Sequence, residues 1–262
     1  IKVKNSLEAI EYYHSIALDY IYSYGRLETF NNVINNKSSE YISLKIICDY
    51  NPFNKIDLHD NVFVSGIGGC GKTFFLLHNM QKIIERRIKD TIPFYIPLKE
   101  LTIYQGSNSI IKWLTKSIYH FTGYYITPKE WKELFNKKKV IILADGLNEI
   151  TNYEERNYII TEISNSLKEF KNLHYIVSSR RDDTLSFECH GCSFIKVQIG
   201  DLTDDQIDSF LKSNTSNTRL NKIPAKTRPL LKTAQALAMF VSMINRNSGF
   251  SFESLAMLLL SY

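Results

Sequence analysis

The sequence lacks any apolar run that reaches the roughly 18 residues of a membrane-spanning helix. Its start, IKVKNSLEAIEYYHS, also lacks the apolar segment of a secretion signal. Both absences argue against a membrane protein or a secreted protein. We therefore expect a cytoplasmic protein with no membrane partner.

Cysteine is scarce as well. The cysteines are too few and too scattered in 262 residues for a disulfide framework, which fits a reducing compartment: Cys48, Cys70, Cys189 and Cys192. Cys189 and Cys192 form a CxxC in FECHGCSF, and His190 lies between them. A structural zinc site needs four ligands, and no second pair exists at matching spacing, so this segment alone does not predict a metal site.

A strong excess of one charge sign is also missing. The 32 Lys and Arg against 27 Asp and Glu give a formal charge of +5, and acidic residues are interspersed along the chain. The basic run at residues 137–139 precedes an apolar strand and indicates a solvated turn, with a nucleic-acid or partner contact as the alternative. The charge pattern therefore does not predict nucleic-acid binding by this domain.

What is present is enough apolar sequence, 44% of 262 residues, for one sizeable core and a small second domain. Residues 1–60 are expected to form a helical lead-in or linker: Leu7, Ile10, Ala17 and Ile21 recur at helical spacing, and the pattern resumes in YISLKIICDY. Asn51 and Pro52 mark the boundary that follows.

After this boundary, short apolar strands alternate with helices. The expected strands are NVFVS, IPFYIPL, VIILAD, LHYIVSS and FIKVQI. Strands that are apolar throughout and separated by helices predict a parallel sheet covered on both faces. Residues 61–200 are therefore expected to form a doubly wound α/β domain of about five strands.

Residues 201–262 are expected to form a small helical subdomain and the start of a further domain. LTDDQIDSFLK has an N-cap threonine with acidic residues in its first turn, and a second helix is expected after Pro229, in PLLKTAQALAMFVSMI. The chain begins without Met and ends on an apolar helical pattern, so we expect a piece of a longer protein. Its heavy use of Asn, Lys, Ile and Tyr hints at a low-GC microbe.

The segment VSGIGGCGKTFF contains GxxxxGK[ST], the phosphate-binding loop, between a predicted strand and a predicted helix. The glycines let successive backbone N–H groups face one anion, Lys72 supplies charge for the β and γ phosphates, and the Thr73 hydroxyl ligates Mg²⁺. An empty glycine-rich turn is the alternative. The candidate binding residues of the loop are Gly66, Gly68, Gly69, Cys70, Gly71, Lys72, Thr73 and Phe74.

Two further strands end in polar residues. VIILADGLNEI places Asp145 at a strand end, where it can hold Mg²⁺ through water, and Glu149 where it can orient an attacking water. LHYIVSSRR ends in Arg180 and Arg181, and Arg180 would sense the γ-phosphate if this strand lies between the other two. The alternatives are an acidic turn and an ordinary surface loop.

In order, GIGGCGKT, IPFYIPLKEL, VIILADGLNEI, LHYIVSSR, IGDLTDDQIDSFL and RPLL resemble a NACHT-type STAND NTPase, from about residue 60 to 245. The resemblance implies that Lys72 and Thr73 bind phosphate and Mg²⁺, that Asp145 is the Walker B aspartate, that Glu149 is the catalytic acid and that Arg180 is the sensor arginine. It also implies that Pro229 lies against adenine, which selects ATP and ADP.

Three positions near these motifs agree with the family pattern or depart from it. Gly146 fits the small residue favoured after the Walker B aspartate. Asn148 replaces a frequent aspartate, which leaves the strength of hydrolysis open, and Phe74 stands where a second Thr or Ser is common.

The resemblance implies a switch: a closed ADP-bound monomer that takes up ATP and forms a homo-oligomer when C-terminal repeats sense a protein trigger, bringing N-terminal effectors together. Neither the sensor nor the effector is recognisable in these 262 residues. The microbial hint points to bacterial antiviral defence. An AAA+-like, nucleic-acid-dependent ATPase and a non-hydrolysing nucleotide-binding scaffold are the alternative functions.

Overall fold

In the computed structural model, the apolar segments of the sequence form one β-sheet. The structure describes residues 3–23, 46–48, 60–85, 91–104, 106, 108–180, 189, 191–215 and 218–246. The chain divides into two compact units. The first contains residues 1–19, 48–66 and 72–198, and the second contains residues 20–47, 67–71 and 199–262.

The sheet confirms the predicted α/β fold. Its strands are β1 (Ile46–Cys48), β2 (Val62–Gly66), β3 (Thr91–Pro97), β4 (Lys139–Asp145), β5 (Leu173–Arg180) and β6 (Ile195–Ile199), in the order β1-β6-β2-β5-β4-β3. The five strands from β6 to β3 pair in parallel. Strand β5, which ends in Arg180, lies between β2, which leads into the glycine-rich loop, and β4, which ends in Asp145. This is the position on which the predicted sensor role of Arg180 depends.

The short strand β1 corrects one expectation. The sequence pattern predicted helix for YISLKIICDY, but Ile46–Cys48 is a strand at the edge of the sheet, next to β6. β-branched residues have a high strand propensity in general, and this segment contains two consecutive isoleucines. The remainder of YISLKIICDY lies outside the described residues.

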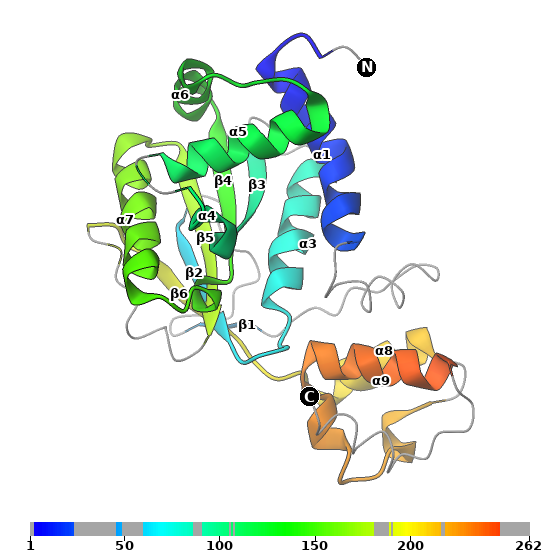
Figure 1. Ribbon diagram of the computed structural model, residues 1–262. Helices are drawn as coiled ribbons and strands as arrows, with labels where there is room; N and C mark the ends of the chain where they lie inside the picture. The colour runs from blue at the N-terminus through cyan, green and yellow to red at the C-terminus, as the bar shows by residue number, and fades with distance from the viewer. Residues whose placement is uncertain are drawn as a thin grey trace. The chain divides into compact units, whose positions relative to one another are not determined.

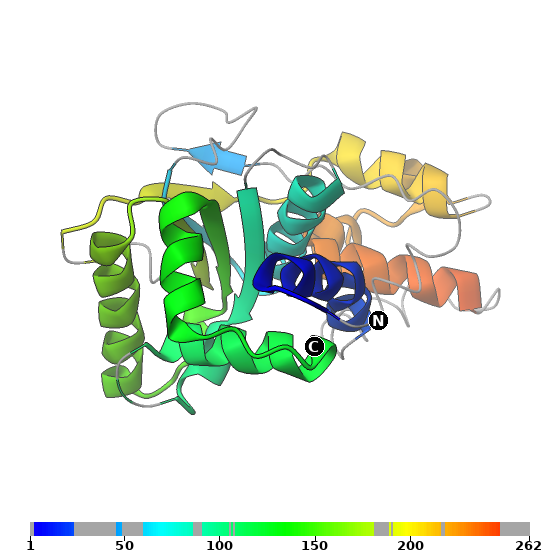
Figure 2. The same cartoon turned by 90° about the horizontal axis from the view of Figure 1, so that it is seen from above.

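Helices cover both faces of the sheet, which is why its strands are apolar throughout. Figures 1 and 2 show α3 and α7 on opposite faces. All five residues of β2 are buried, as is the middle of β4. The helical elements in the first part of the chain are α1 (Ser6–Ser23), most of which belongs to the first unit, α3 (Lys72–Glu85), α4 (Leu98–Leu101), α5 (Ser109–Thr122), α6 (Pro128–Lys137), the 3-10 helix η2 (Leu147–Glu149) and α7 (Tyr153–Glu169).

The N-terminal helix α1 packs beside α3 and against β3 (Figure 1). His14 Nε2 donates a 2.8 Å hydrogen bond to the Pro93 carbonyl, and the Tyr13 ring lies 6.2 Å from that of Phe94. Burial lowers the pKa of His14 to about 4, with the hydrogen bond to Pro93 opposing the shift. The helix at the start of the predicted lead-in is therefore present and packs on the sheet through Tyr13 and His14.

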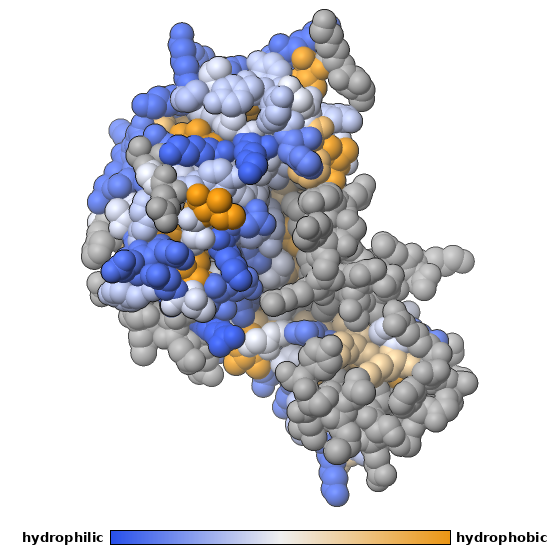
Figure 3. Space-filling model, in the orientation of Figure 1, coloured by the Kyte–Doolittle hydropathy of each residue, from blue (hydrophilic) through white to orange (hydrophobic). Residues whose placement is uncertain are grey.

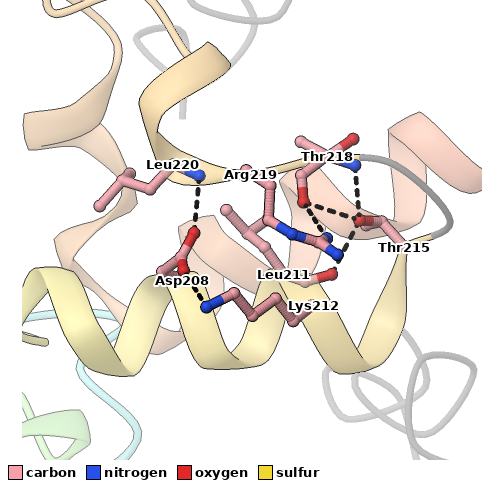
Figure 4. Close-up of polar contacts among 7 residues, drawn as sticks. All are labelled: Asp208, Leu211, Lys212, Thr215, Thr218, Arg219 and Leu220. Carbon is pink, nitrogen blue, oxygen red and sulfur yellow. Dashed lines mark hydrogen bonds and ion pairs between the residues drawn. The ribbon is translucent and has the colours of Figure 1, made fainter.

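The second unit contains the helices that follow the sheet: α8 (Asp204–Asn214), the 3-10 helices η4 (Leu220–Lys222) and η5 (Arg228–Lys232), and α9 (Ala234–Arg246). Thr203 caps α8 as expected, in a capping box with Gln206. Figure 4 shows how α8 holds the segment after it: Asp208 accepts from Leu220 N at 2.9 Å and pairs with Lys212 at 2.7 Å.

The single helix expected after Pro229 is interrupted. Residues Arg228–Lys232 form η5, Thr233 is extended (φ −101°, ψ 146°), and α9 starts at Ala234. The break is stabilised on both sides, because Lys232 O accepts from Leu202 N at 2.8 Å and Thr233 Oγ1 accepts from Ala236 N at 3.3 Å. Residues 247–262, which include SLAMLLLSY, lie outside the described chain.

The visible surface is mostly polar, with small scattered apolar patches (Figure 3). Exposed large apolar side chains come from separate elements: Leu7, Ile67, Ile103, Tyr119, Tyr125 and Tyr153. Isolated side chains of this kind are normal on a folded protein. Within the ranges that the structure describes, none of the helices is long and apolar enough to cross a membrane.

Candidate functional site

The glycine-rich loop joins β2 to α3, as the sequence predicts. Its central part, residues 67–71, belongs to the second unit. Gly69 and Gly71 have φ values of 72° and 102°, a region that favours glycine. Lys72 begins α3, and its Nζ donates a 2.9 Å hydrogen bond to the carbonyl of Gly66. The loop therefore leads directly into a helix N-terminus, which favours anions.

Asp145 is the centre of the polar cluster in the first unit. Its Oδ2 accepts hydrogen bonds from Thr73 Oγ1 at 2.6 Å and from Tyr95 Oη at 2.9 Å. Its Oδ1 accepts a short hydrogen bond from Ser178 Oγ. The structure thus brings together Thr73 and Asp145, which the sequence predicted to share a metal.

The sequence did not predict the roles of Tyr95 and Ser178. Both are buried on the strands that flank β4: Tyr95 on β3 and Ser178 on β5. The sequence feature that could have indicated them is a hydroxyl residue within an otherwise apolar strand, because a buried hydroxyl needs a hydrogen-bond partner. Burial, reinforced by the neighbouring Asp145 carboxylate, raises the pKa of Tyr95 well above its usual value, so its hydroxyl remains a donor at neutral pH.

Glu149 is held near Asp145 by a tight turn. Gly146 has φ 78°, and Glu149 N donates to Gly146 O at 2.8 Å, which starts η2. A Cβ on Gly146 would lie 3.1 Å from both Cγ and Cδ of Glu149. Only a glycine fits between the two acidic residues without displacing Glu149, while the Glu149 side chain itself is exposed. Asn148 is half-buried in the same turn.

Arg180 is the last residue of β5 and is exposed. The parallel register pairs it with Gly66, the first glycine of the motif. Gly66 and Arg180 therefore lie on neighbouring strands at the same edge of the sheet, the edge at which β4 ends in Asp145. This arrangement is the one that a γ-phosphate sensor at Arg180 requires.

Pro229 lies in the second unit, at the start of η5, and is exposed. The same unit holds a contact that the sequence did not predict. Gln235 N, at the start of α9, donates a 3.0 Å hydrogen bond to Gly69 O. A Cβ on Gly69 would lie only 2.8 Å from Gln235 Oε1, so the loop fits closely against this residue.

The oxygen donors at Thr73 and Asp145 fit a magnesium ion. Mg²⁺ prefers carboxylate and hydroxyl oxygens and keeps several waters. The Thr73 hydroxyl donates a hydrogen bond to Asp145, so its oxygen lone pairs can ligate a metal. By contrast, no group of three or more His, Cys, Asp or Glu residues that could hold a metal occurs among the residues with assigned positions, and among these residues Cys70, Cys189 and Cys192 are not joined by disulfides.

Comparisons with solved structures find distant similarity. The replication initiator DnaA bound to AMPPCP and single-stranded DNA is 17% identical over 84% of this chain and 60% of its own, with a TM-score of 0.46. The ORC1 protein of Aeropyrum pernix in complex with DNA is 11% identical over 100% of this chain and 66% of its own, with a TM-score of 0.47. The chain thus spans about three fifths to two thirds of these proteins.

A search of curated proteins finds no match. The NACHT domain family matches residues 60–218, which is more than half of the chain. The match includes the glycine-rich loop, Asp145, Glu149 and Arg180. The chain therefore belongs to the NACHT domain family of STAND P-loop NTPases.

Proposed function

We propose that this chain is an ATP-driven molecular switch that binds ATP and ADP with Mg²⁺, hydrolyses ATP slowly and assembles with copies of itself when ATP is bound. Membership of the NACHT family makes it a nucleotide-binding P-loop NTPase, of a family whose members are typically ATPases. The observation that carries the proposal is the 2.6 Å hydrogen bond between Thr73 and Asp145, because it joins the phosphate loop motif to the Walker B aspartate.

Each predicted residue has a role in this proposal. The amides of Gly66, Gly68, Gly69, Cys70, Gly71 and Phe74 line the phosphates. Lys72 neutralises the β and γ phosphates, and Thr73 and Asp145 hold Mg²⁺, which screens the phosphate charge when bound. Glu149 accepts a hydrogen bond from the attacking water.

The switch itself depends on reading the γ-phosphate. ATP needs to favour the open state over the closed state by only about 5 kcal/mol to invert their populations. Arg180 would supply part of this difference, because its guanidinium can interact with a γ-phosphate that ADP lacks. Pro229 would contact adenine, as in the family.

The biological setting follows from the family resemblance and the composition. We expect a cytoplasmic protein of bacterial antiphage defence, in which a C-terminal sensor recognises a protein trigger and an N-terminal effector is activated by oligomerisation. Two observations support this setting: the NACHT match and the heavy use of Asn, Lys, Ile and Tyr, which is typical of AT-rich coding sequences. A nucleic-acid-dependent AAA+-like ATPase and a non-hydrolysing scaffold remain as outcomes of the test.

The test compares three variants in ATP binding, single-turnover phosphate release and light scattering. Glu149→Gln should bind ATP, release phosphate at least roughly a hundredfold more slowly and favour assembly, since it removes a catalytic acid or base. Lys72→Ala should bind ATP weakly and stay monomeric. Glu133→Gln, at an exposed ion pair with Lys137, is the matched control and should behave as the parent.

Each alternative function has its own outcome. Equal and negligible phosphate release from the parent and Glu149→Gln would favour the scaffold. Turnover that rises on adding DNA or RNA would favour the AAA+-like ATPase. The switch is wrong if Glu149→Gln and Lys72→Ala both assemble as the parent does.

A further inference from the structure

The carboxylate of Asp145 is held from both neighbouring strands. Tyr95 on β3 donates to Oδ2 at 2.9 Å, and Ser178 on β5 donates to Oδ1. Ser178 is in turn fixed, because its Oγ accepts from Gly146 N at 2.9 Å. The plane of the Asp145 carboxylate is therefore held by donors from both neighbouring strands.

The sheet register explains how Tyr95 reaches Asp145. Pro97 pairs with Asp145 and Tyr95 pairs with Leu143, so Tyr95 and Asp145 stand on the same face of adjacent strands, one pleat apart. A diagonal separation of this kind is within reach of an aromatic side chain. Tyr95 is only 8% exposed, so its hydroxyl is presented to Asp145 and not to bulk water.

The hydrogen bonds to Asp145 limit the number of acceptor positions that its carboxylate has left for a metal. An ionised carboxylate has about four lone-pair positions. In Asp145, Thr73 and Tyr95 use Oδ2 and Ser178 uses one position of Oδ1. The remaining position is on Oδ1, so Asp145 serves a metal through a single acceptor position whose direction depends on Tyr95.

We infer that Tyr95 is a positioning residue for Mg²⁺-dependent nucleotide binding: its buried hydroxyl holds Asp145 Oδ2 beside Thr73 and so fixes the carboxylate whose remaining acceptor position on Oδ1 would serve the ion. This inference rests on the proposed function. Tyr95 touches neither nucleotide nor metal in this role and acts only through Asp145.

The test is a Mg²⁺ titration of the affinity for a fluorescent ATP analogue, starting in EDTA. Tyr95→Phe should raise the half-saturating Mg²⁺ concentration by roughly tenfold, as expected for losing one hydrogen bond to a charged group. Affinity in EDTA should not change. The control is Tyr175→Phe, which removes a buried strand hydroxyl that bonds Ser166 Oγ at 2.8 Å and should leave the titration unchanged.

A double-mutant cycle separates positioning from structural damage. In an Asp145→Asn background, Tyr95→Phe should have no further effect on the Mg²⁺ titration, because it acts through the carboxylate. An unchanged titration, an additive effect in this background, or loss of the folded state in Tyr95→Phe would each overturn the inference alone. A parent protein that binds no ATP with Mg²⁺ would overturn the proposed function as well.

Discussion

Gln235 and Gly69, far apart in the sequence, are joined by a hydrogen bond of 3.0 Å from the Gln235 amide to the Gly69 carbonyl. Gly69 has φ 72°, and a side chain there would collide with Gln235 Oε1. The start of α9 thus fixes one peptide of the glycine-rich loop. The φ value favours glycine at position 69, and a larger residue there would also force the end of the Gln235 side chain to move.

Replacing Gly69 with alanine tests this contact. Gly69→Ala should lower the free energy of unfolding by about 2 kcal/mol, from left-handed strain and displacement of Gln235. Gly68→Ala is the matched control, because a Cβ at that position would have no atom within 4 Å and the φ of Gly68 is not positive. Denaturant unfolding without nucleotide measures both. Adding Gln235→Ala should restore part of the loss, and no restoration would contradict the collision.

A second prediction concerns the turn between Asp145 and Glu149. Gly146→Ala should cost about 2–3 kcal/mol of stability, because it combines a φ of 78° with a 3.1 Å approach to Glu149. Gly123→Ala isolates the strain, since Gly123 has φ 68° with nothing within 4 Å, and should cost about 1 kcal/mol. Phosphate release should fall in Gly146→Ala alone. Equal losses in both variants would refute a special fit at Gly146.

Ser178 provides a third prediction. Ser178→Ala removes a donor to Asp145 and leaves the buried Gly146 N–H without its partner, which should cost about 1–3 kcal/mol. It should also weaken Mg²⁺-dependent ATP binding. Ser65→Ala removes a buried hydroxyl that donates to Val197 O at 3.2 Å, away from Asp145, and should affect stability only. Calorimetric melting and ATP titration distinguish the two effects.

The fourth prediction concerns acid. His14 has a pKa of about 4 in the folded chain against an ordinary value of 6.5, so the unfolded chain binds the proton more readily. Its contribution is fully present above pH 6.5 and is lost as the pH falls toward 4, by up to about 3 kcal/mol. His14→Gln keeps a donor for Pro93 but cannot titrate. The stability gap between parent and variant should shrink between pH 7.5 and 5, and a constant gap would exclude this role for His14.

Five of the six strands that the structure describes, β2 to β6, could be predicted from the sequence because each is a short, largely apolar run between predicted helices or loops. Their order could not, because it depends on pairing between distant segments. Thr73 and Asp145 were found because their motifs are local. Tyr95 was not, because its partner depends on the register between β3 and β4, which no short segment contains. The contact between Gln235 and Gly69 could not be predicted for the same reason, because the two residues are far apart in the sequence. The break at Thr233 in the helix after Pro229 could not be predicted either, because the hydrogen bond beside it is donated by the distant Leu202.

The chain of hydrogen bonds from Gly146 N to Ser178 and on to Asp145 has an evolutionary corollary. The turn that carries Glu149 begins at Gly146, so Asp145 and Glu149 share one set of hydrogen bonds. Under the proposed function, these two residues serve the metal ion and the attacking water. Substitutions at these positions should therefore show epistasis. Under the proposed function, we expect substitutions here that change the rate of hydrolysis to come with compensating substitutions at the coupled positions.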